Sequence, residues 1–226
     1  MAPVTEAKTT TRAGRLHDAI RSDILRGELP PGTPLRLAAL AARYDAGQSV
    51  VREALGRLAE NNLAVLLPNQ GFRVVEASRA DLVALTELRV MLECEALRRS
   101  MERGDVQWEA AVVSAHHVLE RATFLLDESP GSTEEWSRAH AAFHIALVSA
   151  CDNPRMLALT NSLRDGAEIY RQLGLNARFH ELAERDIPCE HRQLMELSTA
   201  RDRRAVDALA QHIQRTTDDL ITAGAL

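Results

Sequence analysis

A change of hydrophobic period divides residues 49–75, SVVREALGRLAENNLAVLLPNQGFRVV, into two kinds of structure. In residues 49–61 the apolar side chains recur every three or four positions, which predicts an amphipathic helix. Residues 63–67 and 72–75 are short runs rich in Val, Leu and Phe, and a turn with proline and glycine separates them. Such runs on either side of a turn predict a β-hairpin, so we expect a helix followed directly by a hairpin.

Two more helices are expected before this stretch. Leu16, Ile20 and Ile24 recur every four residues and predict a helix near residues 15–26. A second, shorter helix carries its apolar residues on one face: Leu37, Leu40, Ala41 and Tyr44. Three helices followed by a hairpin is the element order of a winged helix-turn-helix, in which the third helix enters the major groove of DNA.

The third predicted helix presents a polar face that is suited to contact with DNA. Ser49 and Arg52 lie opposite its apolar stripe, so Arg52 is the candidate contact to a base or phosphate, and Ser49 stands where a helix N-terminus favours a phosphate. The other candidate DNA contacts flank this helix in sequence: Arg36, Gly71 and Arg73. Periodicity alone leaves a second interpretation open, a small helical subdomain whose charged face is merely solvated.

Charge is distributed unevenly along the chain. The whole chain of 226 residues carries a net charge of −5, but residues 1–76 carry +2 and residues 77–226 carry −7. A contact with nucleic acid therefore belongs to the first third of the sequence. Three scattered cysteines without a CxxC pair, and the absence of a signal peptide or a long apolar run, predict a cytoplasmic protein with no membrane segment.

The remainder of the chain carries the period of helices throughout. Six helical segments are predicted, near residues 79–103, 105–128, 133–151, 155–173, 177–199 with a break near Pro188, and 203–222. Without strand signals, these segments predict an all-α antiparallel helical bundle. We therefore expect a mostly α protein in three parts: a flexible arm (1–13), a winged helix-turn-helix DNA-binding domain (14–76) and an all-helical effector-binding and dimerisation domain (77–226).

Histidines are the main chemical feature of this predicted bundle. His140 and His144 are four residues apart and so share one face of a helix, while His191 and His212 lie on two later helices. Imidazoles that converge from three helices in a bundle core would form a transition-metal site. Spacing alone also allows a set of hydrogen-bonded core histidines, because apolar side chains continue the same helix face.

Both parts of the chain resemble known families. Residues 24–35 (ILRGELPPGTPL), the run VREAL at 51–55 and the Asn-Gln-Gly wing at 69–71 resemble the DNA-binding domain of GntR-family regulators. The sequence departs from that family at three positions where basic residues are usual: Gln48, Gly56 and Gln70. These departures put the family's operator preference in doubt for this chain and leave the expected fold unchanged.

The histidines resemble the FCD-type effector domain of the FadR branch, on His140-Ala-Ala-Phe-His144, Asn153, Glu190-His191 and His212. That resemblance implies a divalent metal held by one Asp and three His, of which His144, His191 and His212 match the histidines. His140 stands where Asp is usual, and four neutral imidazoles favour Zn, Ni, Co or Cu. The other histidines of this region match nothing in the family and are expected on the surface: His116, His117 and His180.

The segment Leu88-Arg89-Val90-Met91-Leu92-Glu93 resembles the effector-contacting helix of the same domain, which implies a small carboxylate effector at Arg89. An ion pair between Arg89 and Glu93 is the alternative. Together these features predict a transcriptional regulator that binds an inverted-repeat operator as a homodimer. The alternatives are a metal-dependent helical-bundle enzyme and a metal-free structural interaction protein. The enzyme is disfavoured, because the sequence has no HExxH, P-loop or GxGxxG motif.

Overall fold

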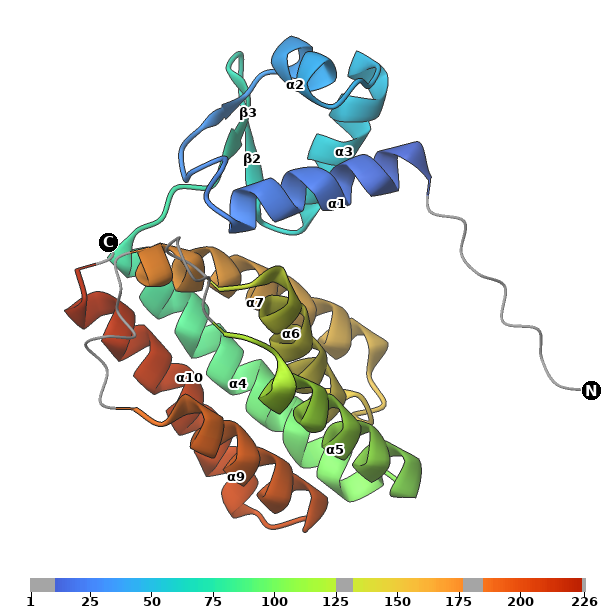
Figure 1. Cartoon of the computed structure of the whole chain (residues 1–226), viewed down its shortest axis with the longest axis vertical. Coiled ribbons are helices and arrows are strands. Elements are labelled where there is room, and N and C mark those ends of the chain that lie inside the picture. The colour runs from blue at the N-terminus through green and yellow to red at the C-terminus, as the bar shows by residue number, and fades with distance from the viewer. Residues whose placement is uncertain (1–10, 125–131, 177–184, 225–226) are drawn as a thin grey trace, which may run out of the picture. The chain divides into compact units, whose positions relative to one another are not determined.

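The computed structural model describes residues 11–124, 132–176 and 185–224, and the chain forms two compact units, residues 1–76 and residues 77–226 (Figure 1). We call these the N-terminal unit and the C-terminal unit. Among the described residues, no helix is both long enough and apolar enough to span a membrane.

The N-terminal unit has the predicted three helices and hairpin. Its elements are α1 (Arg12–Leu25), β1 (Pro34–Leu35), α2 (Leu37–Arg43), α3 (Gln48–Glu60), β2 (Ala64–Leu67) and β3 (Gly71–Val74). The antiparallel sheet has the order β1-β3-β2, and β1 was not predicted because two residues are too few to show a period. Helix α1 begins at Arg12, inside the arm expected at residues 1–13, because the Thr11 side chain accepts a hydrogen bond from the Gly14 N–H and caps the helix.

A buried carboxylate joins the first two helices of this unit. Asp23 on α1 accepts hydrogen bonds from Arg26 at 2.6 Å, from Arg43 of α2 at 2.5 Å and from the Tyr44 hydroxyl at 2.7 Å. Burial by itself would raise the pKa of Asp23, but the hydrogen bonds from Tyr44 and Arg26 and the charge of Arg43 outweigh it and lower the pKa. The ionised carboxylate therefore braces α2, which in turn packs against α3.

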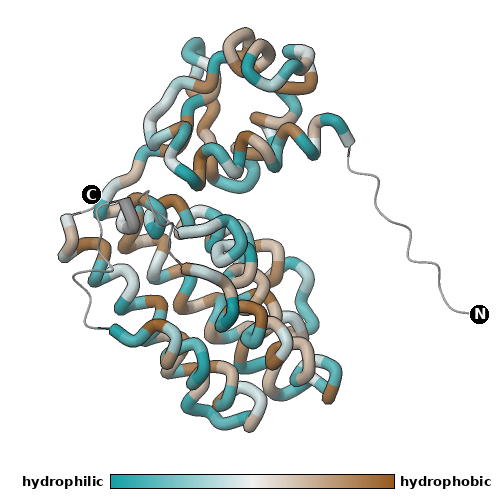
Figure 2. The backbone as a smooth tube through the Cα atoms, in the orientation of Figure 1, coloured by the Kyte–Doolittle hydropathy of each residue, from teal (hydrophilic) through white to brown (hydrophobic). Residues whose placement is uncertain are grey.

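The C-terminal unit is helical throughout its described residues. Its helices are α4 (Arg79–Arg103), α5 (Val106–Arg121), α6 (Glu134–Val148), α7 (Pro154–Asn176), α9 (Ile187–Thr199) and α10 (Arg204–Thr222). Helix α4 packs against α7 and α10, while α5 packs against α6 and α9. Figure 2 shows hydrophobic and hydrophilic residues alternating along these helices, and their apolar faces meet in one core that includes Leu97, Phe143 and Leu209. The predicted all-α antiparallel bundle is confirmed.

One predicted helix boundary in this unit needs correction. The helix expected over residues 105–128 ends at Arg121, after which Ala122 turns to an extended backbone (φ −74°, ψ 135°). The break expected near Pro188 agrees with the start of α9, which Asp186 caps, so that Pro188 lies in the first turn, where a proline needs no N–H partner. Residues 125–128 and 177–184, which are also predicted to be helical, lie outside the described residues.

The Asp23 network provides a test of the N-terminal unit. Asp23→Asn removes the charge but keeps the size of the side chain, so we expect the unfolding free energy of this unit to fall by about 1–3 kcal/mol. Hydrogen exchange of peptides from α1 to α3 measures this loss, and Asp18→Asn, at an exposed position on the same helix, is the control. Since the pKa of Asp23 is lowered in the folded state, its stabilisation is present above the ordinary value of 3.8 and disappears as the pH falls through the folded value. Equal exchange in the two variants would contradict this role.

Candidate functional site

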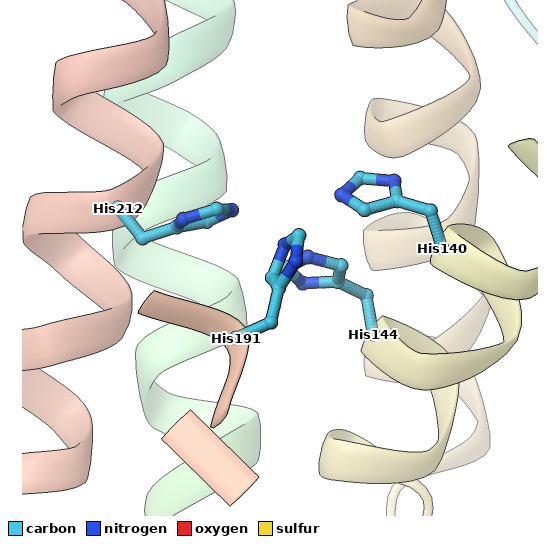
Figure 3. Close-up of side chains that lie close together, drawn as sticks. All are labelled: His140, His144, His191 and His212. Carbon is cyan, nitrogen blue, oxygen red and sulfur yellow. The ribbon is translucent and has the colours of Figure 1, made fainter. Parts of the chain in front are cut away.

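Four histidine side chains meet inside the C-terminal unit. His140 and His144 come from successive turns of α6, His191 from α9 and His212 from α10. Figure 3 shows the four rings pointing toward one another, with His212 facing the two rings of α6. One nitrogen from each ring can be chosen such that all four lie within 4.8 Å of one another. The structure thus brings together the four histidines that the sequence predicted as metal ligands, and we call them the histidine tetrad.

Hydrogen bonding leaves much of the histidine tetrad unsatisfied. Among the described residues, both ring nitrogens of His144 and the Nε2 atom of His191 are buried without a hydrogen-bond partner. A buried polar atom without a partner costs about 1–3 kcal/mol, so the arrangement is unfavourable for an ordinary protein core. The alternative of a hydrogen-bonded set of core histidines does not account for these nitrogens.

Burial also determines the charge of the rings. Removal from water holds the pKa of His140, His144 and His191 well below the ordinary value of 6.5, and neighbouring histidines lower it further. These rings are therefore neutral near pH 7. A neutral imidazole offers a nitrogen lone pair, which is the form that binds a metal.

A carboxylate outside the histidine tetrad orients one of its rings. The Nδ1 atom of His212 lies 2.8 Å from Oε2 of Glu190, and Glu190 also forms an ion pair with Arg185. Burial alone would raise the pKa of Glu190, but hydrogen bonds from His212 and Arg185 hold it well below the usual range. An ionised Glu190 keeps a proton on Nδ1 of His212, so that the lone pair of Nε2 is free for a metal. Glu190 is part of the sequence resemblance to the FCD-type domain, but that resemblance does not assign it this role.

The donor set fits a divalent transition metal. Four neutral imidazoles suit Zn, Ni, Co or Cu, whereas Mg and Ca prefer oxygen ligands. The residues that would hold the metal are His140, His144, His191 and His212. A cation at this place would provide a partner for one of the two buried nitrogens of His144 and for Nε2 of His191.

Arg89 lies on α4, which packs against the tetrad helices α6 and α10, and it forms the ion pair that was its alternative role. Its Nε atom donates a hydrogen bond of 2.8 Å to Oε1 of the fully buried Glu93. The positive charge of Arg89 also contributes to lowering the pKa of His140 and of His212, so the guanidinium is electrostatically close to both rings. The two interpretations of Arg89 are therefore compatible, and its role as an effector contact stays a prediction.

Four of the five candidate DNA contacts are exposed on the N-terminal unit, and three of these lie at α2 and α3. Arg36 precedes the first residue of α2, Ser49 lies in the first turn of α3, and Arg52 lies on the outer face of α3. The buried face of α3 comprises Val51, Ala54, Leu55 and Leu58. This arrangement leaves the polar side of α3 available to a partner.

The hairpin residues differ from each other in what they contact. Gly71 begins β3 with a positive φ of 79°, a conformation that a side chain would strain. Arg73 is half-buried, and its Nη1 atom donates a 2.6 Å hydrogen bond to the Gly32 carbonyl, which gives it a structural role that the sequence did not indicate. At Gly56, a Cβ would meet nothing within 4 Å, so packing does not explain why this position lacks a larger residue.

One histidine expected on the surface is buried. His116 belongs to the inward face of α5 with Trp108, Val112 and Leu119, and its ring packs edge-on against Phe143 at 5.5 Å. Its spacing of four from Val112 was a signal for this that the sequence reading missed. His117 is exposed as expected, and His180 lies outside the described residues.

Comparison with protein families assigns both units. Residues 12–74 match the family described as "Bacterial regulatory proteins, gntR family", and residues 84–215 match the FCD domain. The chain belongs to the GntR family and carries an FCD domain. The predicted resemblance is thereby confirmed, and the GntR regulator is a transcriptional regulator rather than an enzyme.

Relatives of this GntR regulator match it over most of the length of both proteins. It is 35% identical over 218 residues to the uncharacterized HTH-type transcriptional regulator BphR of Paraburkholderia xenovorans (strain LB400), covering 94% of this chain and 86% of that protein. It is 32% identical over 197 residues to the HTH-type transcriptional repressor GlaR of Escherichia coli (strain K12), covering 86% and 89%.

Solved structures have the same fold. The E. coli McbR/YncC structure superposes with a TM-score of 0.72 at 20% identity, covering 94% of this chain and 98% of that chain. A putative GntR regulator from Rhodococcus sp. RHA1 gives a TM-score of 0.70 at 21% identity, with coverage of 93% and 98%. At these identities the likeness is one of fold.

The histidine tetrad predicts a metal-dependent melting temperature. A metal that binds only the folded protein stabilises it by mass action, by about 2.7 kcal/mol when its free concentration is a hundred times Kd. We expect a chelator to lower the melting temperature of the zinc-loaded protein, and His144→Ala to melt at the same temperature with or without zinc. Calorimetry with metal analysis measures both, and His117→Ala, at an exposed position, should behave as the unmodified protein. If the purified protein takes up no stoichiometric metal and chelation has no effect, the core-histidine interpretation holds instead.

Proposed function

We propose that this GntR regulator binds operator DNA as a homodimer and releases it when a small carboxylate binds beside a metal in the C-terminal unit. The observation that carries the proposal is the set of buried, unpaired nitrogens in His144 and His191, next to the guanidinium of Arg89. Among the described residues, both nitrogens of His144 and Nε2 of His191 have no hydrogen-bond partner, while Arg89 is paired with Glu93. Together they favour a metal and an anion as the missing partners.

The DNA-binding half of the proposal rests on the outer face of α3. Arg52 is exposed there and would contact a base or a phosphate, while Ser49 and Arg36 would contact the backbone. Gly71 would let the tip of the wing approach the DNA closely, and Arg73 would add a contact only through the nitrogens not used on Gly32. A single recognition helix reads few base pairs, so a two-fold dimer on an inverted repeat would double the contacts.

The metal-binding half of the proposal uses the histidine tetrad. A divalent transition metal, when bound, would act as a Lewis acid that accepts a carboxylate oxygen of the effector. The chain's own contribution is to keep the rings neutral by burial and to fix the tautomer of His212 through Glu190. Arg89 would add a charge-assisted hydrogen bond to the same carboxylate, which is stronger than one between neutral groups.

Helix α4 offers a route from the effector to the DNA-binding unit. It begins at Arg79, directly after the boundary between the two units, and carries Arg89 and Glu93 on its third and fourth turns. A ligand that shifts Arg89 would therefore act on the same helix that follows the linker. By linkage, operator DNA must weaken effector binding by the factor by which the effector weakens DNA binding, and about 5–150-fold would be typical.

A DNA-release titration tests the proposal. Fluorescence anisotropy would follow an operator fragment, selected from genomic DNA, while carboxylates are added to the zinc-loaded protein. Arg52→Ala should weaken operator binding by about 1–3 kcal/mol, since a bidentate base contact is lost. Arg89→Ala should bind the operator normally and respond less to the carboxylate.

Two further variants control for indirect effects in this titration. Arg98→Ala, at an exposed position of α4, should match the unmodified protein in both measurements. Arg89→Lys, which retains the charge opposite Glu93, guards against misfolding as the cause of a blunted response. Unchanged operator affinity in Arg52→Ala, or an unchanged carboxylate response in Arg89→Ala, would contradict the assigned contact.

A further inference from the structure

Two buried guanidinium groups beside the histidine tetrad share one carboxylate. Arg89 of α4 donates from Nε to Oε1 of Glu93 at 2.8 Å, and Arg164 of α7 donates from Nε to Oε2 of the same residue at 2.9 Å. The side chains of Arg89 and Arg164 are only 14% and 11% exposed, and that of Glu93 only 1%. Among the described residues, the ion pairs of both arginines end at Glu93, so two positive charges face one negative charge away from water.

Arg164 also has a donor that nothing in the described protein uses. Its Nη2 atom is buried and has no hydrogen-bond partner among the described residues, while Nη1 makes only a long contact of 3.4 Å with Asn161. An unsatisfied donor on a charged group costs more than one on a neutral group. An anionic ligand would supply both the missing acceptor and the missing negative charge.

The arginine pair lies on α4 and α7, and both helices pack against α6, which carries His140 and His144. The charge of Arg164 helps to lower the pKa of His144, and that of Arg89 helps to lower the pKa of His140 and His212. An imidazole ring is either neutral or positive, so the tetrad supplies no negative charge to either guanidinium. A dication bound by the tetrad would make the positive excess larger, and a monocarboxylate would leave most of it uncompensated.

Arg185 also lies near the tetrad, but its charge is matched by Glu190 and Asp219. Arg171 is a further arginine near the tetrad, and it too is less suited to this role. Its Nη1 atom is also buried without a partner, but its charge is paired with Glu168, which serves no second arginine among the described ion pairs. Its guanidinium lies over the Trp136 ring at 4.8 Å, and Trp136 stacks on His140. The Arg171 charge is thus already matched, whereas the charge of Arg164 is not.

We propose that the effector is a small dicarboxylate whose second carboxylate is bound by Arg164. This inference rests on the proposed function, in which the first carboxylate binds beside the metal and Arg89. Arg164 then distinguishes dianionic from monoanionic ligands, because only a second acid group reaches its Nη2 donor. Glu93 holds Arg89 and Arg164 at a fixed spacing and so sets the length of ligand that bridges them.

Matched pairs of ligands test this assignment. Isothermal titration of the zinc-loaded protein would compare each straight-chain dicarboxylate of three to six carbons with the monocarboxylate of the same carbon number. We expect at least one dicarboxylate to bind roughly ten-fold or more tightly than its partner, the gain of one charge-assisted hydrogen bond. Arg164→Gln should reduce the dicarboxylate to the affinity of the monocarboxylate and leave zinc and operator binding unchanged. Arg98→Gln, at an exposed position, should retain the full preference.

The results of these titrations distinguish a failure of the Arg164 assignment from a failure of the proposed function. If mono- and dicarboxylates bind equally, or if Arg164→Gln keeps the preference, the role of Arg164 is overturned while a carboxylate effector stands. If no carboxylate binds the zinc-loaded protein, the proposed function itself fails and the inference fails with it. Should Arg164→Gln not fold, Arg164→Lys keeps a charge opposite Glu93 but lacks the second nitrogen. It is expected to lose most of the preference, and retention of the full preference would overturn the assignment.

Discussion

Four imidazole rings lie in the C-terminal unit where a helical bundle would ordinarily place aliphatic side chains, and three of them, His144, His191 and His212, are buried away from water. That constraint determines much of the surrounding structure. Each ring must be neutral, as the depressed pKa values of His140, His144 and His191 indicate, and each nitrogen then needs a partner. Glu190 provides one for His212, but both nitrogens of His144 lack one within the described protein. A divalent metal would supply a partner for one nitrogen of each ring, including one of the two on His144.

The same constraint connects distant parts of the chain. Three helices supply the histidine tetrad, and two others, α4 and α7, supply the arginines that share Glu93. A ligand bound among these histidines and arginines would contact side chains from most helices of the bundle. Its binding would therefore change the packing of the whole unit. Under the proposed function, helix α4 would carry this influence toward the linker, because it starts where the N-terminal unit ends. In that unit the buried Asp23 holds α2 against α1, and α3 presents Arg52 outward from this framework.

The sequence predicts helices and strands that have a clear hydrophobic period. It predicts less well where those elements end and which side chains form ion pairs. Helices α3 and α4 and the hairpin follow from apolar spacing, whereas the two-residue strand β1 has no period to detect. The end of α5 at Arg121 was missed because the following residues continue to look apolar. His140, His144, His191 and His212 were foreseen as a set because helical spacing and family resemblance agree on them. Arg164 was not foreseen, because its role depends on its ion pair with Glu93, which is 71 residues away in sequence.

The central claim is that the histidine tetrad is a metal site, and X-ray absorption spectroscopy of the zinc-loaded protein tests it most directly. The spectrum reports the ligand atoms around the metal and shows imidazole rings by their outer-shell scattering. The account predicts a shell of nitrogen and oxygen without sulfur, with four imidazoles in the unmodified protein and three in His140→Ala. A sulfur ligand, or a spectrum that is the same in His140→Ala, would place the zinc elsewhere and contradict the account.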